Sequence, residues 1–87
     1  MAERDSEAHL RYAFVRDGSL TSLPRRGPMI DAACRFLAAR FVRGRRYRES
    51  EVNQLLADDA PDHATLRRLP VDRGFLDRAA GWYWREE

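Results

Sequence analysis

Apolar residues recur three and four positions apart in several stretches of the chain, a spacing that predicts amphipathic helices. The best-defined stretch covers residues 28–43, where one face carries Ile30, Ala33, Cys34, Leu37 and Phe41, widened by Met29 and Phe36. Pro28 suits a first helical position and Gly44 suits the residue just past the end. We expect this helix to be the first of three core helices, with Arg35, Arg40 and Arg43 facing water.

A narrower apolar stripe precedes it and predicts a helix over residues 6–15. Leu10, Ala13 and Phe14 form the stripe, and Ser6 is placed to cap the first turn. Asp17 and Gly18 then indicate a turn. Residues 19–23 are expected to form a short edge strand that Pro24 terminates.

The stretch from Gly44 to Gly74 has the outline of a helix-turn-helix. A short extended piece ends at Tyr47, which we expect to anchor the core. A helix over residues 49–57 follows, burying Val52, Leu55 and Leu56, and residues 58–61 break it.

The second helix of this outline begins after Asp62, a good N-cap, and stops near Arg73. Its pattern turns Leu66 inward and Arg68 and Ala64 outward, with Arg67 at the boundary. Pro70 lacks an amide and crowds the preceding turn, so the helix is predicted to end or kink around Leu69. Gly74 then supplies a left-handed exit.

The C-terminal segment predicts a β-hairpin with arms at residues 75–78 and 82–85 and a tip at residues 79–81. Alternation places Trp82 and Trp84 on one face and Tyr83 on the other. At least one tryptophan is expected to touch the N-terminal helix, the strand near Leu20 or a partner chain. The predicted fold is therefore α+β, mostly α: a winged helix-turn-helix of three core helices with a hairpin wing, preceded by an extra helix and a short strand.

The length of 87 residues suits a single domain over residues 1–87, with the extra helix and strand at 1–24 and the helix-turn-helix core and wing at 28–85. No stretch predicts a membrane span or a signal peptide, so a bacterial-type cytoplasmic protein is expected. Cys34 is the only cysteine and lies in an apolar stripe, which indicates a buried structural thiol.

Charge is unevenly distributed along the chain. Residues 25–48 contain eight arginines and one acid, whereas residues 49–66 contain five acids and no base. All sixteen basic side chains are arginine, whose planar guanidinium suits phosphate and carboxylate partners. The pattern predicts one basic and one acidic face.

The residues give little support for catalysis, so no enzyme activity and no cofactor are predicted. His9, His63 and Cys34 fall on three separate predicted helices, so no nucleophile and base adjoin. The five glycines are isolated and form no phosphate loop. His63 with the neighbouring aspartates is a weak metal site and an ordinary helix start, so no metal is predicted either.

The string GRRYRESEVNQLLADDAPDHATLRR, followed by VDRGFLDR and a Tyr83-Trp84 ending, resembles domain-of-unknown-function family 2087 over about residues 14–85. The resemblance implies a bacterial protein in a transcription-regulator context, without a settled biochemical activity. Two positions depart from the family pattern. Arg48 stands where Thr or Ser usually caps the second helix, which removes the capping box with Glu51, and Pro70 stands where an aliphatic residue is usual.

Two hypotheses about function remain open. In the first, a winged helix binds duplex DNA through the second helix of the turn motif, the wing and flanking arginines. The residues assigned to this contact are Arg45, Arg46, Arg48, Thr65, Arg67, Arg68, Arg78 and Arg85. In the second, Asp58, Asp59 and Asp62 repel phosphate and the domain mediates protein interaction or dimerisation without DNA. No small-molecule ligand is predicted. A continuous positive face around Thr65–Arg68 would favour DNA, and a neutral one with exposed Leu69 or Trp82 would favour a protein partner.

Overall fold

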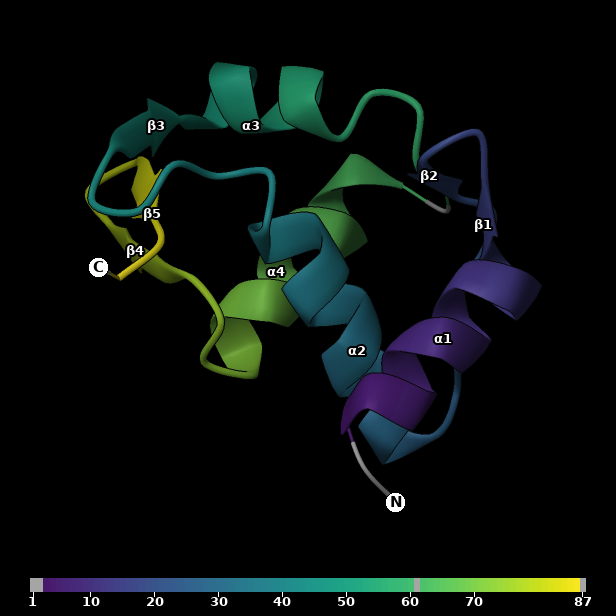
Figure 1. Cartoon of the computed structure of the whole chain (residues 1–87). Helices are drawn as coiled ribbons and strands as arrows, with labels where there is room; N and C mark the ends of the chain where they lie inside the picture. Colours follow the sequence, from purple (N-terminus) through teal and green to yellow (C-terminus); the bar gives the residue numbers. More distant parts are fainter. Residues whose placement is uncertain (1–2, 61, 87) are drawn as a thin grey trace.

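Four helices alternate with short antiparallel strands in the computed structural model (Figure 1), which describes residues 3–60 and 62–86. The elements are α1 (Glu3–Phe14), β1 (Val15–Arg16), β2 (Ser19–Leu20), α2 (Gly27–Ala38), β3 (Arg46–Arg48), α3 (Glu49–Leu55), α4 (His63–Asp72), β4 (Asp77–Ala79) and β5 (Trp82–Trp84). The predicted α+β class is confirmed. Helix α1 and the sheet that contains β3 lie at opposite ends, with α2 and α4 between them (Figure 1).

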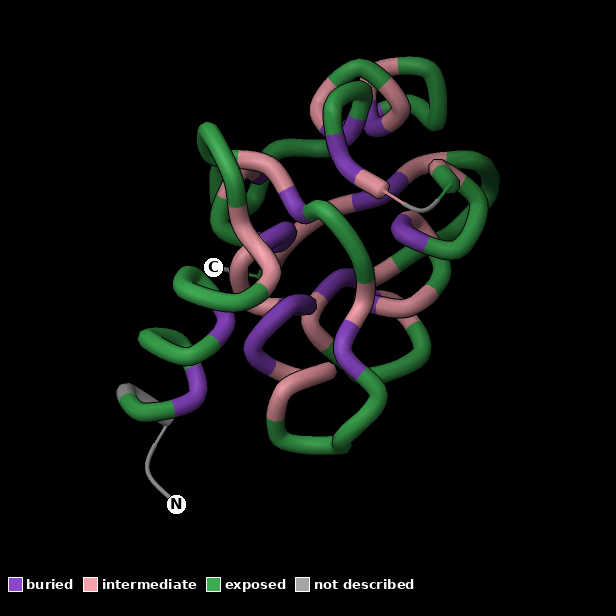
Figure 2. The backbone as a smooth tube through the Cα atoms, turned by 90° about the vertical axis from the view of Figure 1, so that its right-hand side faces the viewer, coloured by how far each residue is buried: buried purple, intermediate pink, exposed green. Residues whose placement is uncertain are grey.

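Helix α1 begins before the predicted cap. It starts at Glu3 and holds Ser6 within it as a buried residue, so the assignment of Ser6 as N-cap is wrong. Leu10 lies one turn further along and is buried against α2. The tube in Figure 2 shows this amphipathic pattern, with buried stretches of α1 facing the molecule and exposed stretches outside.

The predicted turn at Asp17 and Gly18 is confirmed, because both residues have positive φ (53° and 81°), as a two-residue hairpin turn requires. It joins β1 to β2, with Val15 opposite Leu20. The expected strand over residues 19–23 is only two residues long. Its partner, β1, comes from the end of the stretch predicted as helix.

Helix α2 is shorter than the predicted 28–43. After Ala38 the hydrogen bonds become those of a 3₁₀ turn, since Arg40 N–H donates to the Leu37 carbonyl (3.2 Å) and Phe41 N–H to the Ala38 carbonyl (3.0 Å). The next amide, of Val42, donates to the Tyr47 hydroxyl at 2.8 Å and so leaves the helical pattern. Phe41 is nevertheless buried, edge-on to the ring of Tyr47.

Strands β3, β5 and β4 form a three-stranded antiparallel sheet in that order. Tyr47 pairs with Tyr83, and both are buried, which confirms Tyr47 as a core anchor. The predicted C-terminal hairpin is confirmed, but its first strand is residues 77–79 and not 75–78, so Ala79 pairs with Trp82 and the tip is Ala80 and Gly81, which both have positive φ (51° and 83°). The sequence indicated β3 only as an extended piece, but it is the third strand of this sheet.

Helix α4 has its predicted cap, and α3 keeps part of the capping box that Arg48 was predicted to remove. Asp62 caps α4, because its carboxylate accepts from the Thr65 amide (2.9 Å) and hydroxyl (3.1 Å). These bonds lower the pKa of Asp62. At α3 half of a capping box survives: Glu51 accepts from the Arg48 amide at 3.0 Å, while the arginine side chain cannot accept a bond in return. Helix α3 ends at Leu55, before the predicted Ala57.

Pro70 lies inside α4 without ending it. The helix continues to Asp72, so its predicted end near Arg73 is confirmed and the predicted end around Leu69 is wrong. Pro70 is buried, and its carbonyl accepts from the amides of Phe75 (2.8 Å) and Leu76 (3.2 Å). Gly74, with φ 83°, makes the predicted left-handed exit. The chain therefore folds back on Pro70 instead of breaking at it.

The core gathers apolar side chains from α1, β2, α2, α3, α4 and the sheet. Leu66 is buried and Arg68 and Ala64 are exposed, as predicted. Cys34 is also buried, and burial raises the pKa of its thiol to about 11. The buried core residues are Leu10, Leu20, Ala32, Ala33, Leu37, Ala38, Phe41, Tyr47, Val52, Leu56, Leu66, Leu76 and Tyr83.

Asp59 joins the N-terminal hairpin to the turn between α3 and α4. Its side chain is fully buried and accepts from the Leu20 amide (2.7 Å) and from the guanidinium of Arg40, which approaches both carboxylate oxygens. Arg40 also donates to the carbonyls of Leu55 (2.9 Å) and Gly18 (3.2 Å). Ala60 N–H completes the junction by donating to the Leu20 carbonyl at 2.9 Å.

The prediction that Arg35 and Arg40 face water is therefore wrong, since only 25% and 22% of their side chains are exposed. Arg40 turns inward to Asp59, and the Nε of Arg35 lies 3.9 Å from the Glu7 carboxylate. Arg43 is exposed as predicted, and it donates to the Glu86 carbonyl at 3.2 Å.

Replacing Asp59 should destabilise the fold strongly. Asp59→Ala leaves the Arg40 guanidinium and the Leu20 amide without their acceptor, at an expected cost of about 3 kcal/mol in the free energy of unfolding. Urea denaturation measures this cost. The matched control is Asp58→Ala, at the exposed neighbouring position, with an expected change within about 0.5 kcal/mol. Equal stability of the two variants would show that Asp59 does not hold this junction.

Candidate functional site

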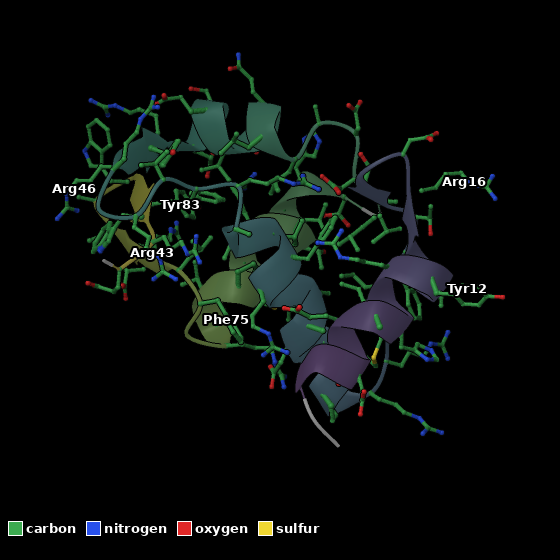
Figure 3. The ribbon with its side chains drawn as sticks, in the orientation of Figure 1. Tyr12, Arg16, Arg43, Arg46, Phe75 and Tyr83 are labelled. Carbon is green, nitrogen blue, oxygen red and sulfur yellow. The ribbon has the colours of Figure 1, made fainter. Side chains whose placement is uncertain are left out.

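The residues assigned to nucleic-acid contact lie in two regions. Thr65, Arg67 and Arg68 lie on α4, whereas Arg45, Arg46, Arg48, Arg78 and Arg85 lie on or beside the three-stranded sheet. Figure 3 shows Arg46 at the sheet end of the molecule and Arg16 at the opposite end.

The Arg67 side chain is held by contacts with α3. Its Nη1 donates to Asn53 Oδ1 at 2.6 Å, and its Nη2 lies 3.3 Å from the Glu49 carboxylate. Only 16% of its side chain is exposed. The predicted boundary position is confirmed, and the side chain braces α4 against α3.

The outward face of α4 is close to neutral. Arg68 is exposed, but the exposed acids Asp62 and Asp72 lie on either side of it. Thr65 is also exposed, with its amide and hydroxyl bonded to the Asp62 carboxylate. Leu69 is half-buried. This face lacks the continuous positive charge that would favour reading of a DNA groove.

The outer face of the three-stranded sheet carries two arginine–tryptophan pairs. Arg46 lies opposite Trp84 and Arg48 opposite Trp82, on the face away from the buried Tyr47–Tyr83 pair. Each guanidinium carbon lies over its partner indole, at 4.0 Å from the ring centroid of Trp84 and 3.9 Å from that of Trp82. Cation–π contact of this kind is favourable and holds a guanidinium in place. The prediction that at least one tryptophan touches the N-terminal helix, the strand near Leu20 or a partner chain stays a prediction, and the structure adds an arginine partner for each tryptophan.

The other sheet arginines differ in their surroundings. Arg45 lies 3.3 Å from the Glu51 carboxylate and 4.7 Å above the ring of Tyr47. Arg78 is exposed, with its guanidinium carbon 5.6 Å from the ring centroid of Tyr83. Arg85 is half-buried beside the end of β5.

Acidic partners thus divide the assigned arginines into two sets. Arg45 and Arg67 form ion pairs with acids of α3. Within residues 5–60 and 62–86, no acid lies at ion-pair distance from the other five, which we call the unpaired arginines: Arg46, Arg48, Arg68, Arg78 and Arg85.

An acidic pair borders the sheet face near Trp84. Glu86 accepts from the Trp84 indole N–H at 3.3 Å and from the carboxyl group of Asp77. The shared hydrogen bond raises the pKa of Asp77 and lowers that of Glu86. The cross-strand row Arg46–Trp84–Asp77 therefore ends at an acidic residue, whereas the neighbouring row Arg48–Trp82–Ala79 ends at an alanine.

A hollow of about 360 Å³ between α1 and α2 is the other candidate. Arg11, Arg35 and Arg40 line it, with the Phe36 ring 5.4 Å from the guanidinium carbon of Arg11 and 5.2 Å from that of Arg40. Arg40 is already bonded to Asp59. The Glu7 carboxylate also lines the hollow and offsets a further positive charge. The hollow is therefore less suited to an anion than its arginines suggest.

The family model described as "Uncharacterized protein conserved in bacteria (DUF2087)" matches residues 19–85. The chain belongs to this family. The DUF2087 match begins at β2 and covers the sheet, α2, α3 and α4, so that both regions of assigned arginines fall inside it. No curated protein and no solved structure matches the chain. None of the described helices is long and apolar enough to cross a membrane.

Sequence reasoning missed the pairing of arginines with tryptophans. The signal is present in the two alternations Arg46-Tyr47-Arg48 and Trp82-Tyr83-Trp84, which match residue for residue once β3 pairs with β5. Because β3 was not expected to join the hairpin, the tryptophans were not assigned to Arg46 and Arg48.

Arg67 and Arg68 are neighbours of the same residue type and should differ in their effect on stability. Arg67→Ala removes the bonds to Asn53 and Glu49 and should lower the free energy of unfolding by about 1–2 kcal/mol. Arg68→Ala removes an exposed, unpaired side chain and should change it by less than about 0.5 kcal/mol. Thermal and urea unfolding measure both. An Arg68→Ala variant as destabilised as Arg67→Ala would contradict the division into paired and unpaired arginines.

Proposed function

We propose that residues 28–85 form a winged helix-turn-helix that binds nucleic acid in transcriptional control. The element order α2, β3, α3, α4, β4, β5 supports this fold, with α3 and α4 as the turn motif and β4–β5 as the wing. The sheet order β3-β5-β4 also supports it, since the wing then pairs with the strand that precedes the turn motif.

The observation that carries the proposed function is the set of unpaired arginines. An arginine that holds no carboxylate keeps its N–H donors available for phosphate, and guanidinium is well suited to phosphate recognition. Three of the five, Arg46, Arg48 and Arg78, also lie over aromatic rings that hold them at the surface. Contacts of this kind position a protein on nucleic acid without reading its sequence.

A role without catalysis agrees with these residues. Cys34 is buried and its raised pKa keeps the thiol protonated at neutral pH. His9 and His63 lie on α1 and α4 respectively. The chain would therefore act by binding, and the near-neutral α4 face predicts weak sequence preference.

A protein-interaction or dimerisation module is the second candidate. The acids that flank Arg68 and the half-buried Leu69 favour it, since both are ordinary at a protein contact and unfavourable facing phosphate. Tyr12 and Val42, with 92% and 60% of their area exposed, are large hydrophobic side chains at the surface. A concentration-dependent dimer that binds no DNA would favour this candidate.

Duplex binding should depend on Arg68 and Arg78. Fluorescence anisotropy with a labelled duplex of arbitrary sequence should show binding at low salt that weakens as salt rises. Arg68→Ala with Arg78→Ala should weaken binding about tenfold and lower the slope against log salt by about 2, because each lost phosphate contact contributes roughly 0.9.

The control for this experiment is Arg16→Ala, which removes an exposed arginine at the end of the molecule opposite Arg46 and the three-stranded sheet (Figure 3). It should change duplex affinity by less than about twofold, because salt screens the interaction of a single distant charge with the duplex. The proposal fails if the wild-type chain does not bind at low salt, or if Arg16→Ala weakens binding as much as the double variant.

A further inference from the structure

The arginine–tryptophan face, defined as Arg46, Arg48, Trp82 and Trp84, stacks each arginine on a ring of the neighbouring strand. Each guanidinium carbon lies about 4 Å over an indole ring, close to the van der Waals contact distance of carbon atoms. Strand pairing fixes the register, since Arg46 faces Trp84 and Arg48 faces Trp82. The arginines are therefore held before any ligand arrives, which reduces the entropy lost on binding.

Stacking leaves part of each guanidinium available. One side of the group lies on an indole, while Arg46 and Arg48 are exposed and, within residues 5–60 and 62–86, no acid lies at ion-pair distance from either; the Glu86 carboxylate attracts Arg46 from beyond that distance. A planar cation on a ring can accept a second flat group on its outer side, and nucleobases stack on arginine planes in this way. Its N–H edge can bind phosphate at the same time.

The spacing of the two arginines distinguishes single strands from duplexes. Arg46 and Arg48 are two residues apart on one strand, which separates them by roughly 6.6 Å. Successive bases along one strand of a duplex are only about 3.4 Å apart, and pairing and stacking enclose their faces. Neighbouring bases can occupy both arginines only when they are unstacked.

We propose that this face binds single-stranded nucleic acid, with one unstacked base on each of Arg46 and Arg48 and the intervening phosphate on their N–H edges. The inference rests on the proposed function and assigns a ligand class to one part of it. Single-stranded DNA and RNA share this chemistry, so oligothymidylate and oligouridylate are tested in parallel. The acids Asp77 and Glu86 border Trp84, so the backbone leaves the face on the side of Trp82.

The two tryptophans make the test specific. Trp82 and Trp84 are the only tryptophans of the chain, and both lie beneath the proposed bases. Titration with unlabelled ten-nucleotide dT or U should therefore quench intrinsic fluorescence in a saturable way. A labelled oligonucleotide, followed by anisotropy, should give the same dissociation constant.

Three variants separate stacking from charge. Arg46→Ala with Arg48→Ala should weaken binding at least tenfold, because stacking contributes roughly 1–3 kcal/mol per base. Arg46→Lys with Arg48→Lys keeps the charge but removes both planes, and should still weaken binding at least fivefold. Arg16→Ala, an exposed arginine outside the assigned binding set, should leave quenching within about twofold of wild type. Circular dichroism checks that each variant is folded.

Each outcome decides between the two proposals. Oligonucleotide binding seen by anisotropy without tryptophan quenching, or unchanged in the lysine variant, overturns the single-strand site and leaves the proposed function standing. Absence of binding to both duplex and single strands overturns both. Equal quenching by a polyglutamate peptide of the same charge shows a surface for acidic protein segments and overturns the assignment to nucleic acid.

Discussion

The contact on which the fold depends most is the one between Asp59 and Arg40. The carboxylate is fully buried, and it links the Leu20 amide of the N-terminal hairpin to the guanidinium that follows α2. A buried charge needs such partners, because removing it from water is otherwise costly. Because Asp59 lies in the turn between α3 and α4, its bonds to Arg40 and Leu20 fix those two helices against α2 and β2. This placement determines which side chains of α3 and α4 face outward.

The same constraint, repeated at other acids, decides which arginines remain for a ligand. Glu49 and Glu51 of α3 hold Arg67 and Arg45, and Asp31 of α2 holds Arg73 at 2.5 Å. The acidic segment that seemed to oppose DNA binding thus partly neutralises arginines of its own fold. The arginines without an acidic partner lie in two places. Arg68 lies on the near-neutral face of α4, and Arg46 and Arg48 lie on the sheet, where they are stacked on tryptophan. In the proposed function the sheet is therefore the stronger candidate for the binding surface, and not the helix that a helix-turn-helix outline indicates first.

Local chemistry could be predicted from the sequence, and distant partners could not. The Asp62 cap, the Asp17–Gly18 turn and the Gly74 exit each depend on a few neighbouring residues, so residue type alone indicated them. Arg40 and Asp59 are nineteen positions apart, and helical periodicity places the arginine outward because it takes no account of a buried acid elsewhere. Pro70 was predicted to end or kink α4 around Leu69, because residue type does not indicate that the amides of Phe75 and Leu76 fold back on its carbonyl. Of the assigned site, exposure of Arg68 followed from periodicity, while the engagement of Arg67 and the stacking of Arg46 required the folded chain.

The most direct measurement of this account is a side-chain NMR spectrum of the arginine Nε–Hε groups, recorded while a short oligonucleotide is added. Signals of Arg46, Arg48 and the other unpaired arginines are expected to shift, and those of Arg40, Arg67 and Arg73 are expected to stay fixed because acids already occupy them. Shifts in Arg40, Arg67 and Arg73 with none in Arg46 and Arg48 would contradict this expectation, since ligand would then be binding the arginines that the fold holds for itself.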